Sequence, residues 1–175
     1  MEFRAADLQD LSQLKALYRE LVVDLNRRGI HTWDEYYPSE FVEGDIREHN
    51  LYLLCDGSAI ASVFALCPFN PGENAVTWKY SSGKALYLER FGVNLKYFRQ
   101  GIGSYMLSKA KETAKQKGAD HLRLFVVTSN EPAIRFYLKN GFTKAEGEYV
   151  QVVESDYIFH EWGYESVLSP NSSIQ

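Results

Sequence analysis

The chain has 175 residues, of which 45% are hydrophobic and 24% are charged, and its formal net charge is −4. These are ordinary values for a globular protein, and the length predicts one domain with a substantial hydrophobic core. The negative charge argues against a general nucleic-acid binder, because neutralising phosphates requires a basic surface.

The start of the chain and its cysteines predict the compartment. The opening residues MEFRAADLQD hold no apolar signal segment, and no apolar run approaches the roughly 18 residues of a membrane span. Cys55 and Cys67 lie in apolar segments without CxxC or metal-ligand spacing, which indicates two buried free thiols in a reducing environment. We therefore expect a cytoplasmic protein with no metal site and no membrane partner.

The first half of the chain predicts a strand, two helices and a hairpin. After a short strand at residues 3–5, Asp7 caps a helix whose leucines repeat at helical spacing until Gly29 ends it. A second helix is expected at residues 39–49. Two apolar runs then flank an Asp-Gly dipeptide at 56–57, which is typical of a hairpin turn.

The second half alternates strands and helices. The expected elements, in chain order, are a loop at 70–84, a strand at 85–94, a helix at 103–117, a strand at 121–127, a helix at 130–141 and two closing strands at 142–148 and 150–162. An antiparallel first half followed by strand–helix–strand–helix–strand predicts an α/β fold. We expect a single domain over residues 1–168 and a polar tail over residues 169–175.

A glycine turn at residues 99–104 joins a strand directly to a helix. The first amides of a helix lack partners within the helix and, with the positive end of its dipole, form a site for an anion. Gly101 and Gly103 would let a phosphate approach those amides, while Ser104 adds a hydroxyl and Arg99 a positive charge. The alternative is an ordinary turn that uses glycine for its dihedral angles.

Two well-known phosphate-binding motifs do not fit this turn. The dinucleotide fingerprint GxGxxG fails because Met106 stands where its third glycine belongs. The P-loop fails because no Gly-Lys-Ser/Thr follows the turn. Both mismatches argue against a nucleotide-binding α/β domain.

Two blocks of the sequence, VNLKYFRQGIGSYML and NEPAIRFYLKNGF, resemble the GNAT superfamily of acyl-CoA-dependent N-acyltransferases. The resemblance runs from about residue 86 to residue 142. The family pattern R/Q-x-x-G-x-G/A ends here on Gly101, Ile102 and Gly103, although its first position falls on Phe98, with Arg99 one place further on. The pattern N-x-x-A-x-x-F-Y-x-x-x-G-F is matched by Asn130, Ala133, Phe136, Tyr137, Gly141 and Phe142.

The resemblance implies an α/β fold with a mostly antiparallel central sheet, a splayed parallel strand pair and flanking helices. It implies that acetyl-CoA binds in the splay, along the strand edge at residues 91–93, with no metal. Gly92 in this apolar strand suggests a bulge that frees backbone amides. The implied cofactor-binding residues are Phe91, Val93, Arg99, Gln100, Gly101, Ile102, Gly103, Ser104, Asn130 and Tyr137.

The resemblance also implies two catalytic residues. Glu89 would act as general base through water, since its strand neighbours should raise the pKa of its carboxyl. The alternative is a Glu89 paired with Arg90 or another cation, and His31 and His160 are alternative bases. Tyr137 would be the general acid that protonates the leaving thiolate, and the alternative is that it is the core member of an aromatic pair with its neighbour.

The acceptor side is implied to be the loop IHTWDEYYPSE, in which Trp33, Asp34, Tyr36 and Tyr37 suit a cationic or aromatic amine. The alternative is a solvated loop whose aromatic side chains cap the core. We expect an N-acetyltransferase that acts on a primary amine of a small molecule or peptide by direct transfer in a ternary complex. The rival hypothesis is a non-catalytic acyl-CoA sensor with the same fold, and a homodimer is compatible with either.

Overall fold

The computed structural model describes residues 1–154 and 157–168 of the chain. Backbone contacts divide it into two compact units, of which the first comprises Met1–Leu66 and Glu89–Ser108. The second comprises Cys67–Leu88 and the chain from Lys109 onward. The boundary at residue 168 stays a prediction, and the tail predicted at 169–175 lies outside the described residues.

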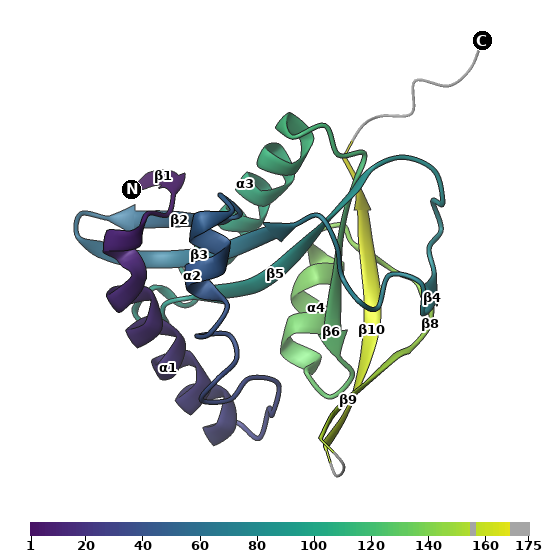
Figure 1. Cartoon of the computed structure of the whole chain (residues 1–175), viewed down its shortest axis with the longest axis horizontal. Coiled ribbons are helices and arrows are strands. Elements are labelled where there is room, and N and C mark those ends of the chain that lie inside the picture. Colours follow the sequence, from purple (N-terminus) through teal and green to yellow (C-terminus); the bar gives the residue numbers. More distant parts are fainter. Residues whose placement is uncertain (155–156, 169–175) are drawn as a thin grey trace. The chain divides into compact units, whose positions relative to one another are not determined.

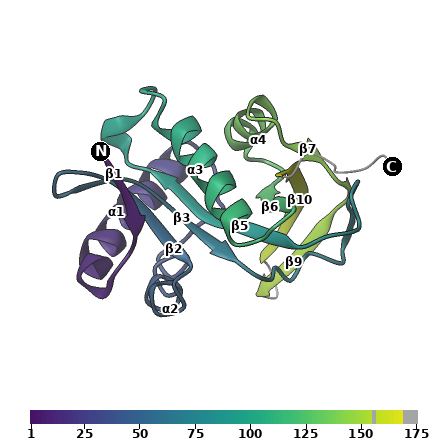
Figure 2. The same cartoon turned by 90° about the horizontal axis from the view of Figure 1, so that it is seen from above.

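The first unit is built from helices and an antiparallel sheet. It holds β1 (Glu2–Ala5), the 3-10 helix η1 (Leu8–Asp10), α1 (Leu11–Arg27), α2 (Val42–Arg47), β2 (Leu51–Asp56), most of β3 (Ala59–Cys67), the end of β5 (Ala85–Val93), the 3-10 helix η2 (Leu95–Tyr97) and the start of α3 (Ile102–Gln116). Hydrogen bonds order its strands β1-β2-β3-β5. Figures 1 and 2 show α1 and α2 beside each other on the same side of the β2–β3 hairpin.

The predicted start of the first helix and the predicted hairpin are confirmed. The Asp7 side chain accepts from the backbone of the first turn, and Asp10 bonds back to the Asp7 amide in a capping box. Gly57 turns the hairpin at a φ of 59°. The second helix is shorter than the predicted range 39–49, because Phe41 caps it without a side-chain hydrogen bond and its first turn begins only at Val42.

The second unit carries the parallel strand pair. It holds β4 (Val76–Thr77), the start of β5, the end of α3, β6 (His121–Val127), α4 (Glu131–Lys139), β7 (Thr143–Lys144), β8 (Glu146–Gly147), β9 (Tyr149–Glu154) and β10 (Tyr157–Val167). The hydrogen-bonded order is β5-β6-β10-β7, β9 pairs with β10, and β4 pairs with β8. The two views show β6 next to β10 in this unit (Figures 1 and 2).

The pairing confirms the predicted fold class. β5 and β6 run parallel over three residue pairs, from Ala85↔His121 to Tyr87↔Arg123. The other strand pairs whose register is described are antiparallel. The sheet is therefore mixed and mostly antiparallel, with one parallel pair and flanking helices.

The prediction of a single closing strand at 150–162 is wrong. β9 ends at Glu154, β10 begins at Tyr157, and the two strands pair antiparallel, so the chain reverses within the predicted range. Alternating apolar residues on both sides of the reversal look like one continuous strand. The polar Ser155-Asp156 step in the sequence was the signal that we missed.

The capping box of η1 yields a prediction about stability. Arg4 donates to both carboxylate oxygens of Asp10, at 2.7 and 2.8 Å, and this contact lowers the pKa of Asp10. Asp10→Asn should lower the free energy of unfolding at pH 7 by about 1–2 kcal/mol, because the charged hydrogen bonds are weakened. The measurement is denaturant unfolding followed by circular dichroism.

The same measurement has an expected pH dependence. A carboxyl group whose folded pKa is depressed stabilises fully above its unfolded pKa, about 3.9, and the stabilisation is lost as the pH falls through the folded value. The stability difference between Asp10→Asn and the unaltered chain should therefore shrink as the pH drops below about 4. A difference that stays constant down to pH 2 would contradict this account.

Candidate active site

The backbone of β5 is irregular at Arg90, in the first unit. Arg90 has a φ of 51°, in the left-handed region that side chains other than glycine rarely adopt. Such a conformation costs of order 1–3 kcal/mol, so the surrounding contacts must impose it. Arg90 is nevertheless buried, and it directly precedes the strand edge at 91–93.

The Arg90 side chain is held by α2. Its guanidinium donates to both oxygens of Asp45, at 2.6 and 2.8 Å, and the two side chains are 7% and 8% exposed. The guanidinium also lies 5.5 Å from the centre of the Phe41 ring. Burial raises the pKa of Asp45, and the Arg90 charge opposes that rise. Each charge is therefore tolerated inside the unit because the other is present.

The Arg90 backbone is held by α1. The Tyr18 hydroxyl donates to the carbonyl oxygen of Arg90 at 2.7 Å, and Tyr18 is fully buried. Burial raises the pKa of Tyr18 well above its ordinary value, so the hydroxyl keeps its proton and remains a donor. The Trp33 ring meets the Tyr18 ring edge-on at 5.6 Å.

The bulge at Gly92 stays a prediction, and Gly92 is not the left-handed residue of this strand. The left-handed residue is Arg90, two positions earlier. Gly92 is needed instead for close packing, since a Cβ there would lie 2.8 Å from a methyl group of Leu21 on α1. Its carbonyl oxygen accepts a hydrogen bond from the buried Ser62 hydroxyl at 2.7 Å. A charged residue inside an apolar strand was the sequence signal for the unusual conformation at Arg90.

The glycine turn follows in the same unit. The Asn94 side chain caps η2 by accepting from the Lys96 amide, and Gln100 donates back to the Lys96 carbonyl oxygen. Arg99 and Gly101 then take φ values of 60° and 79°. These two left-handed residues, separated by Gln100, turn the chain from η2 into the first turn of α3.

Gly101 is required by its dihedral angle. A Cβ built on Gly101 would meet no atom of the described chain within 4 Å, so crowding by the protein does not explain the glycine. The surface around it is exposed at Arg99, Gln100 and Ser104, while Ile102 and Gly103 are half-buried. Phe91 and Val93 are also half-buried. The first unit thus contains the whole predicted cofactor set apart from Asn130 and Tyr137.

The remaining predicted residues of cofactor binding and catalysis have mixed environments. Glu89 is half-buried in the first unit. Asn130, in the second unit, caps α4 by accepting from the Ala133 amide at 3.2 Å. Tyr137 on α4 is 8% exposed, and Phe136 is the less buried member of the pair. Tyr137 is thus the more buried of the two neighbouring aromatic residues, and its role as an acid stays a prediction.

Several residues of the predicted acceptor loop have roles in holding the loop itself. One carboxylate oxygen of Asp34 accepts from the amides of Tyr36 and Tyr37, at 2.8 and 2.7 Å. The Tyr37 ring meets the Phe41 ring edge-on at 5.3 Å. Tyr36 is 60% exposed. The loop is therefore an ordered turn with one aromatic side chain exposed to solvent.

The two histidines named as alternative bases lie on the surface. His31 is exposed and its Nδ1 lies 3.1 Å from the Asn26 side-chain oxygen. The His160 side chain is 50% exposed and lies 3.1 Å from Glu148. Within residues 1–154 and 157–168, no group of three or more His, Cys, Asp or Glu is gathered to hold a metal ion.

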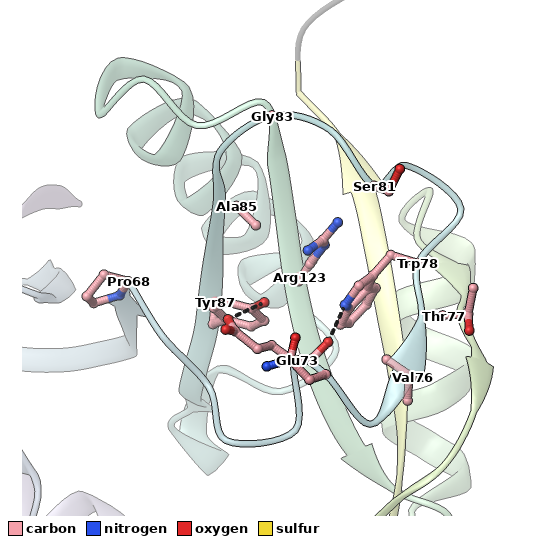
Figure 3. Close-up of a pocket in the computed structure, with 11 residues that line it drawn as sticks. Pro68, Glu73, Val76, Thr77, Trp78, Ser81, Gly83, Ala85, Tyr87 and Arg123 are labelled. Atoms are coloured by element: carbon pink, nitrogen blue, oxygen red, sulfur yellow. Dashed lines mark hydrogen bonds between the residues drawn. The ribbon is translucent and has the colours of Figure 1, made fainter.

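The second unit contains a pocket of about 580 Å³ that the sequence did not predict. Figure 3 shows Tyr87 of β5 and Arg123 of β6 pointing toward the loop that carries Glu73 and Trp78. The Tyr87 hydroxyl donates to the Glu73 carboxylate at 3.1 Å, and the Trp78 indole donates to the Glu73 carbonyl oxygen at 2.9 Å. The Arg123 guanidinium stacks on Trp78 at 4.3 Å.

Two carboxylates and one guanidinium interact at this pocket. Arg123 pairs with Glu165, which is 1% exposed, and donates to the Tyr80 carbonyl oxygen at 2.6 Å. Glu73 adds a second carboxylate to the lining. Burial also raises the pKa of Tyr87, which keeps its hydroxyl as a donor to Glu73. The pocket therefore suits a polar or cationic group.

Known proteins resemble this chain in sequence. The model of the Acetyltransferase (GNAT) family matches residues 14–142. Thialysine N-epsilon-acetyltransferase of Bos taurus is 42% identical over 74 residues, 41% of this chain and 42% of that protein. The Sus scrofa protein of the same name is 39% identical over 74 residues, with the same shares of 41% and 42%. The chain thus spans 42% of the length of these two curated relatives.

Solved structures share the fold. An acetyltransferase of the GNAT family from Streptococcus agalactiae has a TM-score of 0.78 at 16% identity, over 95% of this chain and 94% of that chain. PaiA N-acetyltransferase from Thermoplasma acidophilum in complex with coenzyme A has a TM-score of 0.67 at 20% identity, over 95% and 98%. The Salmonella typhimurium protein yncA with its cofactor acetyl-CoA has a TM-score of 0.69 at 15% identity, over 100% and 98%.

Among the described helices, no segment combines the length and the apolar character needed to cross a membrane.

Proposed function

Because the chain belongs to the acetyltransferase (GNAT) family, we propose that it transfers an acetyl group from acetyl-CoA to a primary amine of a small molecule or peptide. The observation that carries this proposal is the arrangement of the first unit. There the strand edge at 91–93 is followed by a left-handed glycine turn that opens directly into α3. The turn supplies helix amides for a pyrophosphate, and the edge supplies backbone groups for an extended arm.

The reaction is direct transfer in a ternary complex. The neutral amine nitrogen attacks the thioester carbonyl carbon, the carbon–sulfur bond breaks, and the sulfur leaves as a thiolate. Backbone amides stabilise the negative charge that develops on the carbonyl oxygen. In this proposal Glu89 accepts the amine proton through a water molecule, and the Tyr137 hydroxyl gives a proton to the thiolate.

The acceptor amine is mostly protonated at neutral pH, and for this reason the reaction needs a base such as Glu89. An alkylamine with a pKa near 10.4 is neutral in only about one molecule in a few thousand at pH 7. A base close to the nucleophile removes that penalty, and a half-buried carboxylate is suited to the task. The amine of the acceptor is proposed to be primary, in keeping with the thialysine amine named for the two curated relatives.

The first prediction concerns the cofactor. Acetyl-CoA at about 100 times its dissociation constant should stabilise the chain by about 2.7 kcal/mol, which thermal unfolding detects. Gly103→Glu should abolish this shift, because a carboxylate would occupy the place of the phosphates. Ser108→Glu is the matched control, since it adds the same charge to the exposed side of the same helix beyond its first turn. An undiminished shift in Gly103→Glu would place the cofactor elsewhere.

The second prediction concerns the acid. Tyr137→Phe keeps the buried ring and removes only the hydroxyl, so turnover in a rapid-mixing assay should fall by about 10²–10⁴ with acetyl-CoA affinity nearly unchanged. Tyr164→Phe is the control, because Tyr164 is another buried tyrosine of the second unit. Equal turnover in the two variants would remove Tyr137 from the mechanism. Binding of acetyl-CoA by the unaltered chain without turnover would favour the sensor hypothesis.

The third prediction concerns the acceptor, which we propose to meet the loop with Trp33, Asp34, Tyr36 and Tyr37. Asp34→Asn keeps the oxygen that holds the turn and removes only the charge, so KM for a cationic amine should rise about five-fold, or about 1 kcal/mol. KM for acetyl-CoA should not change. Glu73→Gln makes the same substitution in the pocket of the second unit, and an effect confined to that variant would move the acceptor to the pocket.

A further inference from the structure

We propose that Tyr18 and Asp45 are positioning residues that hold β5 at Arg90 in the conformation needed to orient the strand edge toward the acetyl thioester. They would act through Arg90 and touch neither acetyl-CoA nor the amine. The inference rests on the proposed function, because it concerns the edge at 91–93 where the acetyl-CoA arm is proposed to bind.

An arginine at φ 51° inside a strand needs an explanation, because glycine adopts this conformation at no steric cost. Glycine, however, visits extended and left-handed conformations about equally, so it would permit the irregularity without requiring it. An arginine whose side chain and carbonyl are both tied to neighbouring helices is restricted to one conformation. Arg90 therefore specifies the local geometry that glycine would merely allow.

The two sets of hydrogen bonds come from different helices and hold different parts of Arg90. Asp45 of α2 binds the guanidinium through two parallel hydrogen bonds of 2.6 and 2.8 Å. Such a fork fixes the plane of the guanidinium as well as its position. Tyr18 of α1 donates to the Arg90 carbonyl oxygen at 2.7 Å. Together the ties fix the side chain of Arg90 and the peptide group that follows it.

That peptide group connects the ties to the proposed chemistry. The carbonyl of Arg90 and the N–H of Phe91 belong to one planar trans unit, in which they point in opposite directions. By holding the carbonyl oxygen, the Tyr18 hydroxyl sets the direction of the Phe91 N–H. The carbonyl of Gly92, two residues further along the edge, is held in turn by the Ser62 hydroxyl at 2.7 Å. The edge is thus oriented before any substrate arrives, as electrostatic catalysis requires.

Packing of α1 against β5 supports the same arrangement. A Cβ on Gly92 would lie 2.8 Å from Leu21 and 3.7 Å from the Tyr18 ring. Tyr18 and Leu21 therefore pack against the edge so closely that the strand cannot shift toward α1. The Tyr18 ring is itself fully buried and is braced edge-on by Trp33.

The test compares two variants with matched controls in the same unit. Tyr18→Phe removes the hydroxyl, and Asp45→Asn removes the charged fork. Tyr52→Phe is the control for the first, since the Tyr52 hydroxyl donates to the His49 carbonyl oxygen at 3.3 Å. Asp10→Asn is the control for the second, because Asp10 forms a two-bond pair with Arg4. Single-turnover rates and the dissociation constants of both acetyl-CoA and CoA are measured for each.

We expect the single-turnover rate to fall about 10- to 100-fold in Tyr18→Phe and Asp45→Asn, and to stay within about two-fold in the controls. Affinity for CoA, which has no thioester carbonyl, should stay within about two-fold of the unaltered chain in all four variants, while acetyl-CoA loses any advantage over CoA in the two test variants. A merely structural role would not separate the two ligands.

A third variant tests whether a residue that merely tolerates the left-handed conformation is enough for full activity. The double variant Arg90→Gly with Asp45→Asn removes both charges and leaves a residue that tolerates the left-handed conformation. We expect its rate to fall as in Asp45→Asn, since the conformation is allowed but no longer imposed. A rate equal to that of the unaltered chain would overturn the inference.

The other outcomes separate the two proposals. If the unaltered chain binds CoA and turns over, and Tyr18→Phe and Asp45→Asn match their controls, the inference is overturned while the proposed function stands. If the unaltered chain binds neither CoA nor acetyl-CoA, the proposed function fails and the inference fails with it. Should Asp45→Asn not fold, Tyr18→Phe decides alone, because it leaves the ion pair intact.

Discussion

Asp45 and Arg90 form an ion pair inside the first unit, and the pair restricts how the neighbouring elements can pack. A charge taken out of water costs several kcal/mol, and the cost is recovered only if an opposite charge meets it with good geometry. The carboxylate of α2 must therefore reach the guanidinium of β5, at a separation of 45 residues in the chain. Apolar burial alone would allow α2 to slide or rotate, whereas a two-bond fork does not.

The same constraint explains why α1 and β5 are in close contact. The pair ties the Arg90 side chain to one helix, while its carbonyl is tied to Tyr18 of the other helix, 72 residues away. Gly92 then allows the Leu21 side chain of α1 to reach the strand. The buried leucines of α1 supply apolar contacts, and the polar contacts select one register among those that burial permits.

Much of the fold could be predicted because its signals are local. The Asp7 cap and the hairpin after Asp56 each depend on residues within a few positions of one another. The family blocks are local too, and they located the glycine turn. The end of β9 was missed because apolar residues alternate in the same way on both sides of the reversal. Such alternation does not show in which direction the strand runs.

The candidate site could be predicted less well because its contacts join distant residues. A pair between Glu89 and Arg90 was the alternative that their adjacency in the sequence suggested, whereas the structure pairs Arg90 with Asp45. Burial of Tyr137 over Phe136 depends on how α4 meets its own unit, where the Tyr137 ring packs edge-on against Phe142 at 5.6 Å. Neither the pairing of Arg90 with Asp45 nor the burial of Tyr137 can be recognised in a short segment of the sequence.

The residues of the two sequence blocks and those proposed to orient the strand are therefore different sets. The two matching blocks cover residues 93–107 and 130–142, and they include the end of the strand edge, the glycine turn and α4. Tyr18 and Asp45 lie outside both blocks, on helices whose sequences would be read only as amphipathic. A motif can thus mark a backbone segment proposed to bind a cofactor without marking the residues that hold that segment in place. Another member of the fold could hold the same edge with different residues, because the requirement is on the direction of one peptide group and not on the side chains that impose it.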